Sequence, residues 1–152
     1  MQTRRQHLQQ TAIVAGLLAS TGLFPQFAHA AFNKAAFDAK SIADALKAYG
    51  AGAPVESKDV TITAPDIAEN GAVVPLGAST SLPNVKQLLI LVEKNPSSLV
   101  AMFNITDSID AAVSTRAKMG QSSDVYAVAL TTDGKALFAK KEVKVTLGGC
   151  GG

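Results

Sequence analysis

The chain has 152 residues with 14 basic and 12 acidic side chains, which gives a formal net charge of +2. This length fits one domain with short additions, and the near balance of charge excludes the strongly basic surface of a nucleic-acid-binding protein. The single cysteine excludes a disulfide within the chain, although exported proteins usually carry cysteines in pairs.

The first thirty residues have the pattern of an export signal. Arg4 and Arg5 precede an apolar stretch at 11–23, and Ala28-His29-Ala30 forms a small-residue cleavage site. This stretch is too short and too rich in small residues to favour a membrane span, and a retained N-terminal anchor is the alternative. We expect cleavage before Ala31, no membrane insertion, and a location in the bacterial periplasm.

The segment Thr3-Arg4-Arg5-Gln6-His7-Leu8-Gln9 resembles a twin-arginine signal. The arginine pair and Leu8 match the consensus, whereas His7 and Gln9 stand where it has Phe and Lys. A Sec-type signal with two arginines by chance is the alternative, and both routes lead to the periplasm. Cleavage would leave 122 residues with 12 basic and 12 acidic side chains, a nearly neutral domain that is long enough for one core.

Residues 33–49 have the apolar spacing of an amphipathic helix. Asn33 can cap its start, because an asparagine side chain accepts a hydrogen bond from a free N–H of the first turn. Phe37 and Leu46 lie on the apolar face, and Gly50 is a typical terminator. We therefore expect one helix and a loop in the region 31–54.

From residue 55 the apolar spacing changes to a period of two, which is typical of β-strands. The expected strands are 59–63, 72–76, 85–92, 99–105, 111–118, 125–131 and 136–147. The strand at 85–92 is the most apolar and should be central, whereas Pro75 places 72–76 at a sheet edge, with a loop at 77–84. Thr132-Asp133-Gly134-Lys135 predicts a hairpin turn, and Asn70-Gly71 predicts another turn.

Seven short strands, with a turn about every ten residues and no long helix after residue 50, favour an all-β fold. We predict an immunoglobulin-like antiparallel β-sandwich over 55–147, preceded by the N-terminal helix and followed by a flexible C-terminal tail at 148–152. The paired cysteines and the buried Trp of antibody domains are missing, so the prediction covers the architecture alone.

The last five residues are Gly148, Gly149, Cys150, Gly151 and Gly152. Glycine leaves the backbone free to adopt many conformations and places no side chain around the thiol. We expect a flexible arm that holds Cys150 about 10 Å beyond the last strand, at about 3.5 Å per extended residue. The nearest cation in the sequence is Lys144, and the terminal carboxylate opposes ionisation of the thiol. The pattern therefore indicates a covalent attachment point and not a catalytic nucleophile.

The residues leave three alternatives to a covalent carrier open. Cys150 can be a stray or dimer-forming thiol. The terminal carboxylate after a Gly-Gly pair can be activated by ATP, as in ubiquitin-like sulfur carriers, although that class is cytoplasmic and does not need the cysteine. The chain can also be a non-catalytic adhesion or assembly module that uses Cys150 for an intermolecular disulfide.

The tail and several internal segments resemble the SoxY family, the sulfur carriers of thiosulfate oxidation (Sox). The Gly-Gly-Cys-Gly-Gly ending matches the family's tail, and Leu88 to Pro96 resembles its central strand and K-N-P turn. Ser114 to Met119 resembles the family's S-T-R-x-K-M stretch, and residues 123–125 and 141–145 continue the match in the same order. The resemblance covers the chain from about Asn84 to its end.

The resemblance implies a carrier that is not an enzyme and has no cofactor of its own. Thiosulfate would be joined oxidatively to Cys150 as a cysteine S-thiosulfonate on the swinging tail. A c-type haem enzyme (SoxAX-like) would accept two electrons, a di-manganese hydrolase (SoxB-like) would release sulfate, and a molybdenum-haem enzyme (SoxCD-like), where present, would oxidise the remaining sulfur. The chain would act as a SoxYZ heterodimer with a signal-less β-sandwich subunit (SoxZ-like).

Other polar residues have simpler interpretations. His7 and His29 lie in the signal, so the mature chain lacks the commonest metal ligand and general base, and we expect no metal site and no catalytic residue. Asp107 and Asp110 are interpreted as turn residues and not as a catalytic pair. Three lysines are interpreted as a solvated strand face, with guidance of thiosulfate or of an acidic partner as the alternative: Lys140, Lys141 and Lys144.

Overall fold

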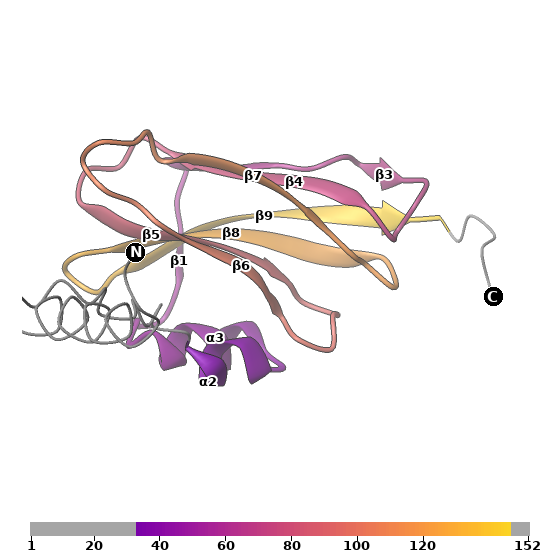
Figure 1. The fold of residues 1–152 in the computed structure, drawn as a ribbon, viewed down its shortest axis with the longest axis horizontal. Helices are drawn as coiled ribbons and strands as arrows, with labels where there is room; N and C mark the ends of the chain where they lie inside the picture. Colours follow the sequence, from indigo (N-terminus) through magenta and orange to yellow (C-terminus); the bar gives the residue numbers. More distant parts are fainter. Residues whose placement is uncertain (1–32, 147–152) are drawn as a thin grey trace, which may run out of the picture. The chain divides into compact units, whose positions relative to one another are not determined.

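Two β-sheets packed face to face and two short helices make up the part of the chain that the computed structural model describes, residues 33–146 (Figure 1). The predicted export signal at 1–30 and the predicted tail at 148–152 lie outside these residues. Within 33–146 no helix is both long and apolar enough to cross a membrane. The expected all-β sandwich is confirmed, and it differs from the prediction in three details.

The first difference is in the N-terminal segment, which forms two helices, α2 (Lys34–Asp38) and α3 (Ile42–Ala48), where the sequence predicts one. Asn33 caps α2 as expected, since its Oδ1 accepts a hydrogen bond from Ala36 N–H at 3.1 Å. Ser41 caps α3 in the same way, through Asp44 N–H at 3.1 Å. A capping residue adopts non-helical backbone angles, so Ser41 interrupts the helix, and the single-helix prediction is wrong for this reason.

The larger sheet has six strands in the order β1-β9-β8-β5-β6, with β3 pairing to a second part of β9. Their bounds are β1 (Val55–Glu56), β3 (Ile67–Ala68), β5 (Val85–Val92), β6 (Leu99–Asn104), β8 (Ser123–Thr131) and β9 (Ala136–Val145). β5 lies between β8 and β6, as predicted for a central strand. Its second part, residues 88–92, is apolar without interruption because both faces of the strand are covered there: Leu88 and Ile90 face the second sheet, and Leu89 and Leu91 face the helices.

The second difference is the presence of β1 and β3, which are too short to show a recognisable period in the sequence. β1 runs parallel to β9 at Leu137 and Phe138, and β3 runs parallel to it at Lys144 and Val145. The other strand pairs are antiparallel as expected. The two short strands cover the outer edge of β9, which would otherwise expose unpaired backbone groups.

The third difference is in the smaller sheet, which has the order β2-β4-β7, with β2 (Val60–Thr63), β4 (Val74–Thr80) and β7 (Ala112–Ala117). The sequence places the strand with Pro75 at an edge and ends it at residue 76. Both expectations are wrong, because β4 is the middle strand and continues to Thr80. β4 pairs with β7 from Val74 onward but with β2 only from Gly77 onward.

Two prolines explain how β4 accommodates Pro75 at a central position. Thr80 N–H donates to Ala111 C=O at 2.9 Å, and successive residues of an antiparallel strand alternate between its two neighbours, so Pro75 directs its nitrogen away from β7. Continuing the β2–β4 register would place Pro65 opposite Pro75. Neither residue has an N–H to exchange, and the pairing between β2 and β4 ends before them.

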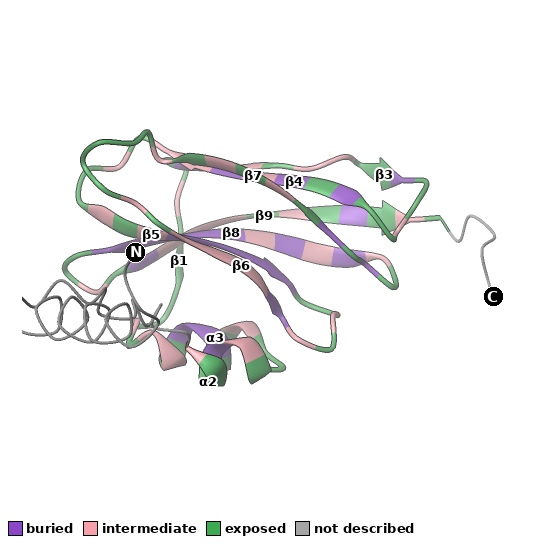
Figure 2. Cartoon of the chain, in the orientation of Figure 1, coloured by how far each residue is buried: buried purple, intermediate pink, exposed green. Residues whose placement is uncertain are grey.

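Two layers of buried apolar side chains hold the structure together (Figure 2). The layer between the sheets includes Val74, Leu76, Leu88, Ile90, Val92, Met119, Val125 and Val143. The layer between the larger sheet and the helices includes Ala36, Ala45, Leu46, Leu89, Leu91, Val128 and Leu130. Burial of each larger side chain contributes about 1.5–3 kcal/mol, so the core and not the turns accounts for most of the favourable free energy of folding.

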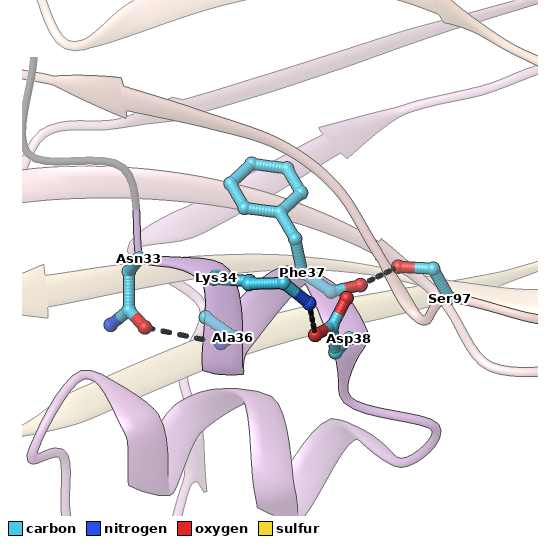
Figure 3. A network of polar contacts seen from close by, with 6 residues as sticks. All are labelled: Asn33, Lys34, Ala36, Phe37, Asp38 and Ser97. Atoms are coloured by element: carbon cyan, nitrogen blue, oxygen red, sulfur yellow. Dashed lines mark hydrogen bonds and ion pairs between the residues drawn. The ribbon is translucent and has the colours of Figure 1, made fainter.

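Helix α2 is attached to the turn between β5 and β6 (Figure 3). Ser97 Oγ donates a hydrogen bond to Phe37 C=O, and Ser98 N–H donates to Ala39 C=O at 3.0 Å. Lys34 and Asp38, which lie one helical turn apart, form an exposed ion pair whose contribution is small. These contacts fix the helices on the larger sheet beside the K-N-P turn.

Candidate functional site

The predicted attachment point lies outside the described residues, so the structure shows the base from which the tail departs. Cys150, its four glycines and Leu147, which the sequence assigns to the last strand, all lie beyond residue 146. β9 ends at Val145, and Thr146 is the last described residue. Val143 is buried and Glu142 and Lys144 are exposed, as the predicted alternation of this strand requires.

The edge of β9 that faces β8 is held, at the end of the strand, by β8 and by the turn that precedes β8. β8 pairs with β9 until Ser123 lies opposite Val143. One position further along, Ser122 Oγ accepts a hydrogen bond from Val145 N–H at 2.9 Å. A serine side chain just before the start of β8 therefore extends the β8–β9 hydrogen-bond ladder by one position, and the N–H of the last residue of β9 keeps an acceptor.

The opposite edge of β9 is held, at the end of the strand, by β3 and by the residue before β3. Lys144 N–H donates to Asp66 C=O at 3.0 Å, and Thr146 N–H donates to Ala68 C=O at 3.0 Å. Backbone hydrogen bonds thus reach the last described residue of the chain. The end of β9 is fixed on both edges, and any freedom of movement in the tail begins after Thr146.

Lys141 joins β9 to the segment between β2 and β3. Its Nζ donates to Ala64 C=O at 2.6 Å and forms an ion pair with Asp66 Oδ1 at 2.9 Å. The interpretation of Lys141 as part of a solvated face is therefore wrong, because its ammonium group bridges two segments. Lys140 is exposed and pairs with Asp124 at 3.4 Å, and Lys144 is exposed with no ion pair to any residue in 33–146.

The predicted turn at Asn70-Gly71 packs against the same base, a contact that the sequence does not reveal. Met119 N–H donates to Gly71 C=O at 2.7 Å. A Cβ atom at Gly71 would lie 2.3 Å from Met119 O and 2.8 Å from Val145 Cγ1, closer than atoms can approach. Glycine is required here because the backbone of the Asn70-Gly71 turn lies directly against the backbone of Met119, after β7.

Three segments that carry the sequence resemblance meet at this end of the sandwich. Asn95 of the K-N-P turn donates through Nδ2 to Lys118 C=O at 2.9 Å. Lys94 N–H donates to Ser123 Oγ at 3.0 Å, and Gln121 Nε2 donates to Lys94 C=O at 3.4 Å. The turns after β5 and β7 are thus bound to each other and to the start of β8, which in turn holds the end of β9.

Two of the described groups with shifted pKa values lie in the hairpin of β8 and β9. Hydrogen bonds from Lys135 and from the Thr131 hydroxyl lower the pKa of Asp133 to about 2, at the opposite end of β9. Burial, followed by the nearby charge of Glu93, raises the pKa of Tyr126. No three His, Cys, Asp or Glu side chains come together as a metal site within 33–146. The described residues at the end of β9 therefore form a hydrogen-bonded support for the residues that follow.

The remaining sequence predictions can be placed simply. Asp107 and Asp110 lie in the irregular segment between β6 and β7, where Asp110 C=O accepts Ala112 N–H at 2.8 Å. His7 and His29 lie outside the described residues. The contacts of Ser122, Lys141 and Gly71 were not predictable from local patterns, because each joins segments that are far apart in the sequence.

The family model "Sulfur oxidation protein SoxY" matches residues 45–150, which is most of the chain. The solved structure of the sulfur carrier protein SoxY from Chlorobium limicola f thiosulfatophilum is 36% identical, with a TM-score of 0.64, and covers 70% of this chain and 97% of that one. A superoxide reductase (neelaredoxin) variant from Ignicoccus hospitalis is 18% identical, with a TM-score of 0.51 and coverage of 57% and 79%, a likeness of fold alone. No curated protein gives a match.

Proposed function

The chain belongs to the SoxY family, and we propose that it holds thiosulfate-derived sulfur covalently on Cys150 and presents it to partner enzymes in the periplasm. Membership of this family confirms that the chain acts in sulfur oxidation as a carrier and not as an enzyme. The attachment residue, the partners and the compartment are part of the proposal.

One observation carries the proposal: the fold is fixed up to Thr146, and only four more residues lead to Cys150. Four extended residues span about 14 Å, a reach that suits entry into a narrow channel of another protein. Glycines on both sides of Cys150 keep the arm thin and its torsions unrestricted. The family match runs through residue 150 and so includes the thiol.

The proposed loading step is an oxidation. The Cys150 thiol loses its proton, its sulfur forms a bond to the outer sulfur of thiosulfate, and two electrons leave to a SoxAX-like c-type haem partner. Water then attacks the terminal sulfone on a SoxB-like di-manganese partner, which releases sulfate and leaves a persulfide on Cys150. A SoxCD-like enzyme, where present, oxidises the remaining sulfur. This chain contributes the nucleophilic thiolate and its delivery.

The sequence supports the proposed partner subunit and the proposed compartment. Residues 1–30 have the pattern of a twin-arginine signal, a route that exports folded proteins and allows a signal-less SoxZ-like subunit to cross the membrane bound to this chain. The exported heterodimer then meets its enzymes in the periplasm, where the haem partner loads it. In an oxidising compartment a single thiol persists because it is used or because it is buried, and the glycines on both sides of Cys150 favour use.

Intact-mass measurement of the mature chain tests the proposal. After incubation with thiosulfate, the SoxZ-like subunit and the haem partner, we expect the mass to rise by one thiosulfate group, less the displaced hydrogen. Cys150→Ser is the matched control: it should have the same melting temperature and gain no mass. A chain recovered only as a disulfide-linked dimer would favour the assembly module instead, and loading of Cys150→Ser would place the attachment at another residue.

A further inference from the structure

One side of the sandwich is left open, where β6 and β7 come together. β6 is the last strand of the larger sheet and β7 is the last strand of the smaller sheet, and the two are in contact. In the described part of the chain no hydrogen bond or ion pair joins them. The opposite side is closed, because Lys141 of β9 reaches Ala64, the residue that follows β2, through a bond of 2.6 Å.

The backbone of β7 presents hydrogen-bonding groups toward this open side. Thr80 N–H donates to Ala111 C=O, and the ladder alternates, so Val113 and Thr115 direct their backbone groups to β4. Ser114 and Arg116 must then direct their N–H and C=O groups away from β4. Both residues are exposed. Their outward groups are spaced two residues apart, as a neighbouring strand requires.

Apolar side chains lie along the same open side. Val100 and Phe103 of β6 and Val113 of β7 pack against the core but are only partly buried. Arg116 is the one charged residue within the two strands. A strip with partly exposed apolar side chains and one cation favours a mainly apolar occupant that carries a single acidic group opposite Arg116.

The other strand edges of the molecule are blunted, and this contrast singles out β7. β6 shares the open side with β7, but its pairing with β5 shifts register between Ile90 and Leu91, and such irregularities turn an edge away from a partner. β1 and β3 cover the outer edge of β9. β2 has four residues and ends beside Pro65, and short strands and prolines are common means of blunting an edge. β7 has six residues in regular register with β4, with no bulge and no proline. An edge of this kind is suited to pairing with another chain.

From these observations we infer that β7 is the docking strand for the second β-sandwich subunit, and this inference rests on the proposed heterodimer. An edge strand of that subunit pairs with the outward N–H and C=O groups of Ser114 and Arg116, and its apolar side chains cover Phe103 and Val113. The exposed half of the S-T-R-x-K-M stretch, which core packing does not explain, thereby gains a role.

The position of this surface places the partner near the tail. Just after β7 ends, Met119 N–H bonds to Gly71, and the turn at Gly71 contacts Val145 at the end of β9. A subunit docked along β7 therefore extends toward the base of the arm.

Residue-resolved hydrogen exchange of the mature chain, alone and with the SoxZ-like subunit, tests the inference. The Ser114 and Arg116 amides should exchange rapidly in the free chain and at least about tenfold more slowly in the complex. The Val113 and Thr115 amides, which are bonded to β4, serve as internal controls and should be protected in both. Protection of Ser114 and Arg116 that rises with the concentration of the chain alone would overturn the inference in favour of a second copy.

A pair of substitutions at one position adds an independent readout. Ser114→Pro removes the outward N–H without removing a bond to β4, and should weaken the complex at least about tenfold. Ser114→Ala keeps that N–H and should bind like the wild type. If the wild-type complex forms but the Ser114 and Arg116 amides still exchange rapidly, the docking strand is wrong and the carrier function stands. If no complex forms, the heterodimer itself is wrong.

Discussion

Gly71 fills a position at the base of the tail where no larger side chain fits. A Cβ there would lie 2.3 Å from Met119 O, so Gly71→Ala must displace the turn or the end of β9. We expect the free energy of unfolding to fall by about 1–3 kcal/mol, the usual cost of overpacking. Urea unfolding measures it, with Gly120→Ala as control, because a Cβ at Gly120 meets nothing within 4 Å. Equal stability of the two variants would contradict this account of the base.

Asp133 gives the fold a pH dependence that can be measured. Its pKa is lowered from 3.8 to about 2, first by a hydrogen bond from Lys135 and then by one from Thr131. Because the folded pKa lies below the unfolded one, the carboxylate stabilises the fold above about pH 4 and loses this effect as the pH falls through 2. The wild type should melt higher than Asp133→Asn at about pH 6, and the difference should vanish near pH 2. A difference that does not change with pH would refute the assignment.

At the scale of the elements, β9 connects the two sheets as well as supporting the tail. Lys141 Nζ bonds to Ala64 C=O at 2.6 Å and is about one third exposed. Lys141→Met should therefore lower the free energy of unfolding by about 1 kcal/mol. Lys144→Met, at an exposed lysine on the same strand, should change it by less than about 0.5 kcal/mol. Thermal unfolding of both variants decides the matter, and a larger loss in Lys144→Met would show that the bridge is misplaced.

The elements with a strong periodic signal were predictable, and those set by distant neighbours were not. β5 has an unbroken apolar run because the second sheet covers one face and the helices cover the other. The single N-terminal helix was a wrong prediction because helical periodicity continues across Ser41, while its side chain caps a new helix. The edge prediction for Pro75 failed because its missing N–H matters only on the side where β2 has already ended.

The candidate site also has one part that was predictable from the sequence and one part that was not. Cys150 and its glycines stand out in the sequence because a lone cysteine between glycines cannot form a disulfide within the chain and has no neighbouring side chains to cover it. The support beneath it depends on Ser122, Gly71 and Lys141, whose partners lie far away along the chain. Composition and spacing cannot reveal such pairs, because each residue type is common in ordinary turns and strands.

At the scale of the whole molecule, the proposed function divides the work of delivery between a fixed support and a short arm. Deletion of Gly148 and Gly149 would shorten the reach beyond Thr146 from about 14 Å to about 7 Å. We expect the deletion variant to fold normally and to react normally with a small thiol reagent, while loading by the haem partner falls by at least about tenfold. The control replaces both glycines with alanine, which keeps the length. Loading at the wild-type rate after deletion would show that reach is not limiting.

Position-specific isotope labelling of thiosulfate tests the central claim most directly. Trypsin cleavage after Lys144 releases the peptide Val145–Gly152, which contains the single cysteine. After reaction with the haem partner and the hydrolase, the outer-sulfur label should remain on this peptide, and the inner-sulfur label should leave as sulfate. If the label appears on another peptide, or if neither sulfur is bound to the chain at any stage, this protein does not carry sulfur on Cys150.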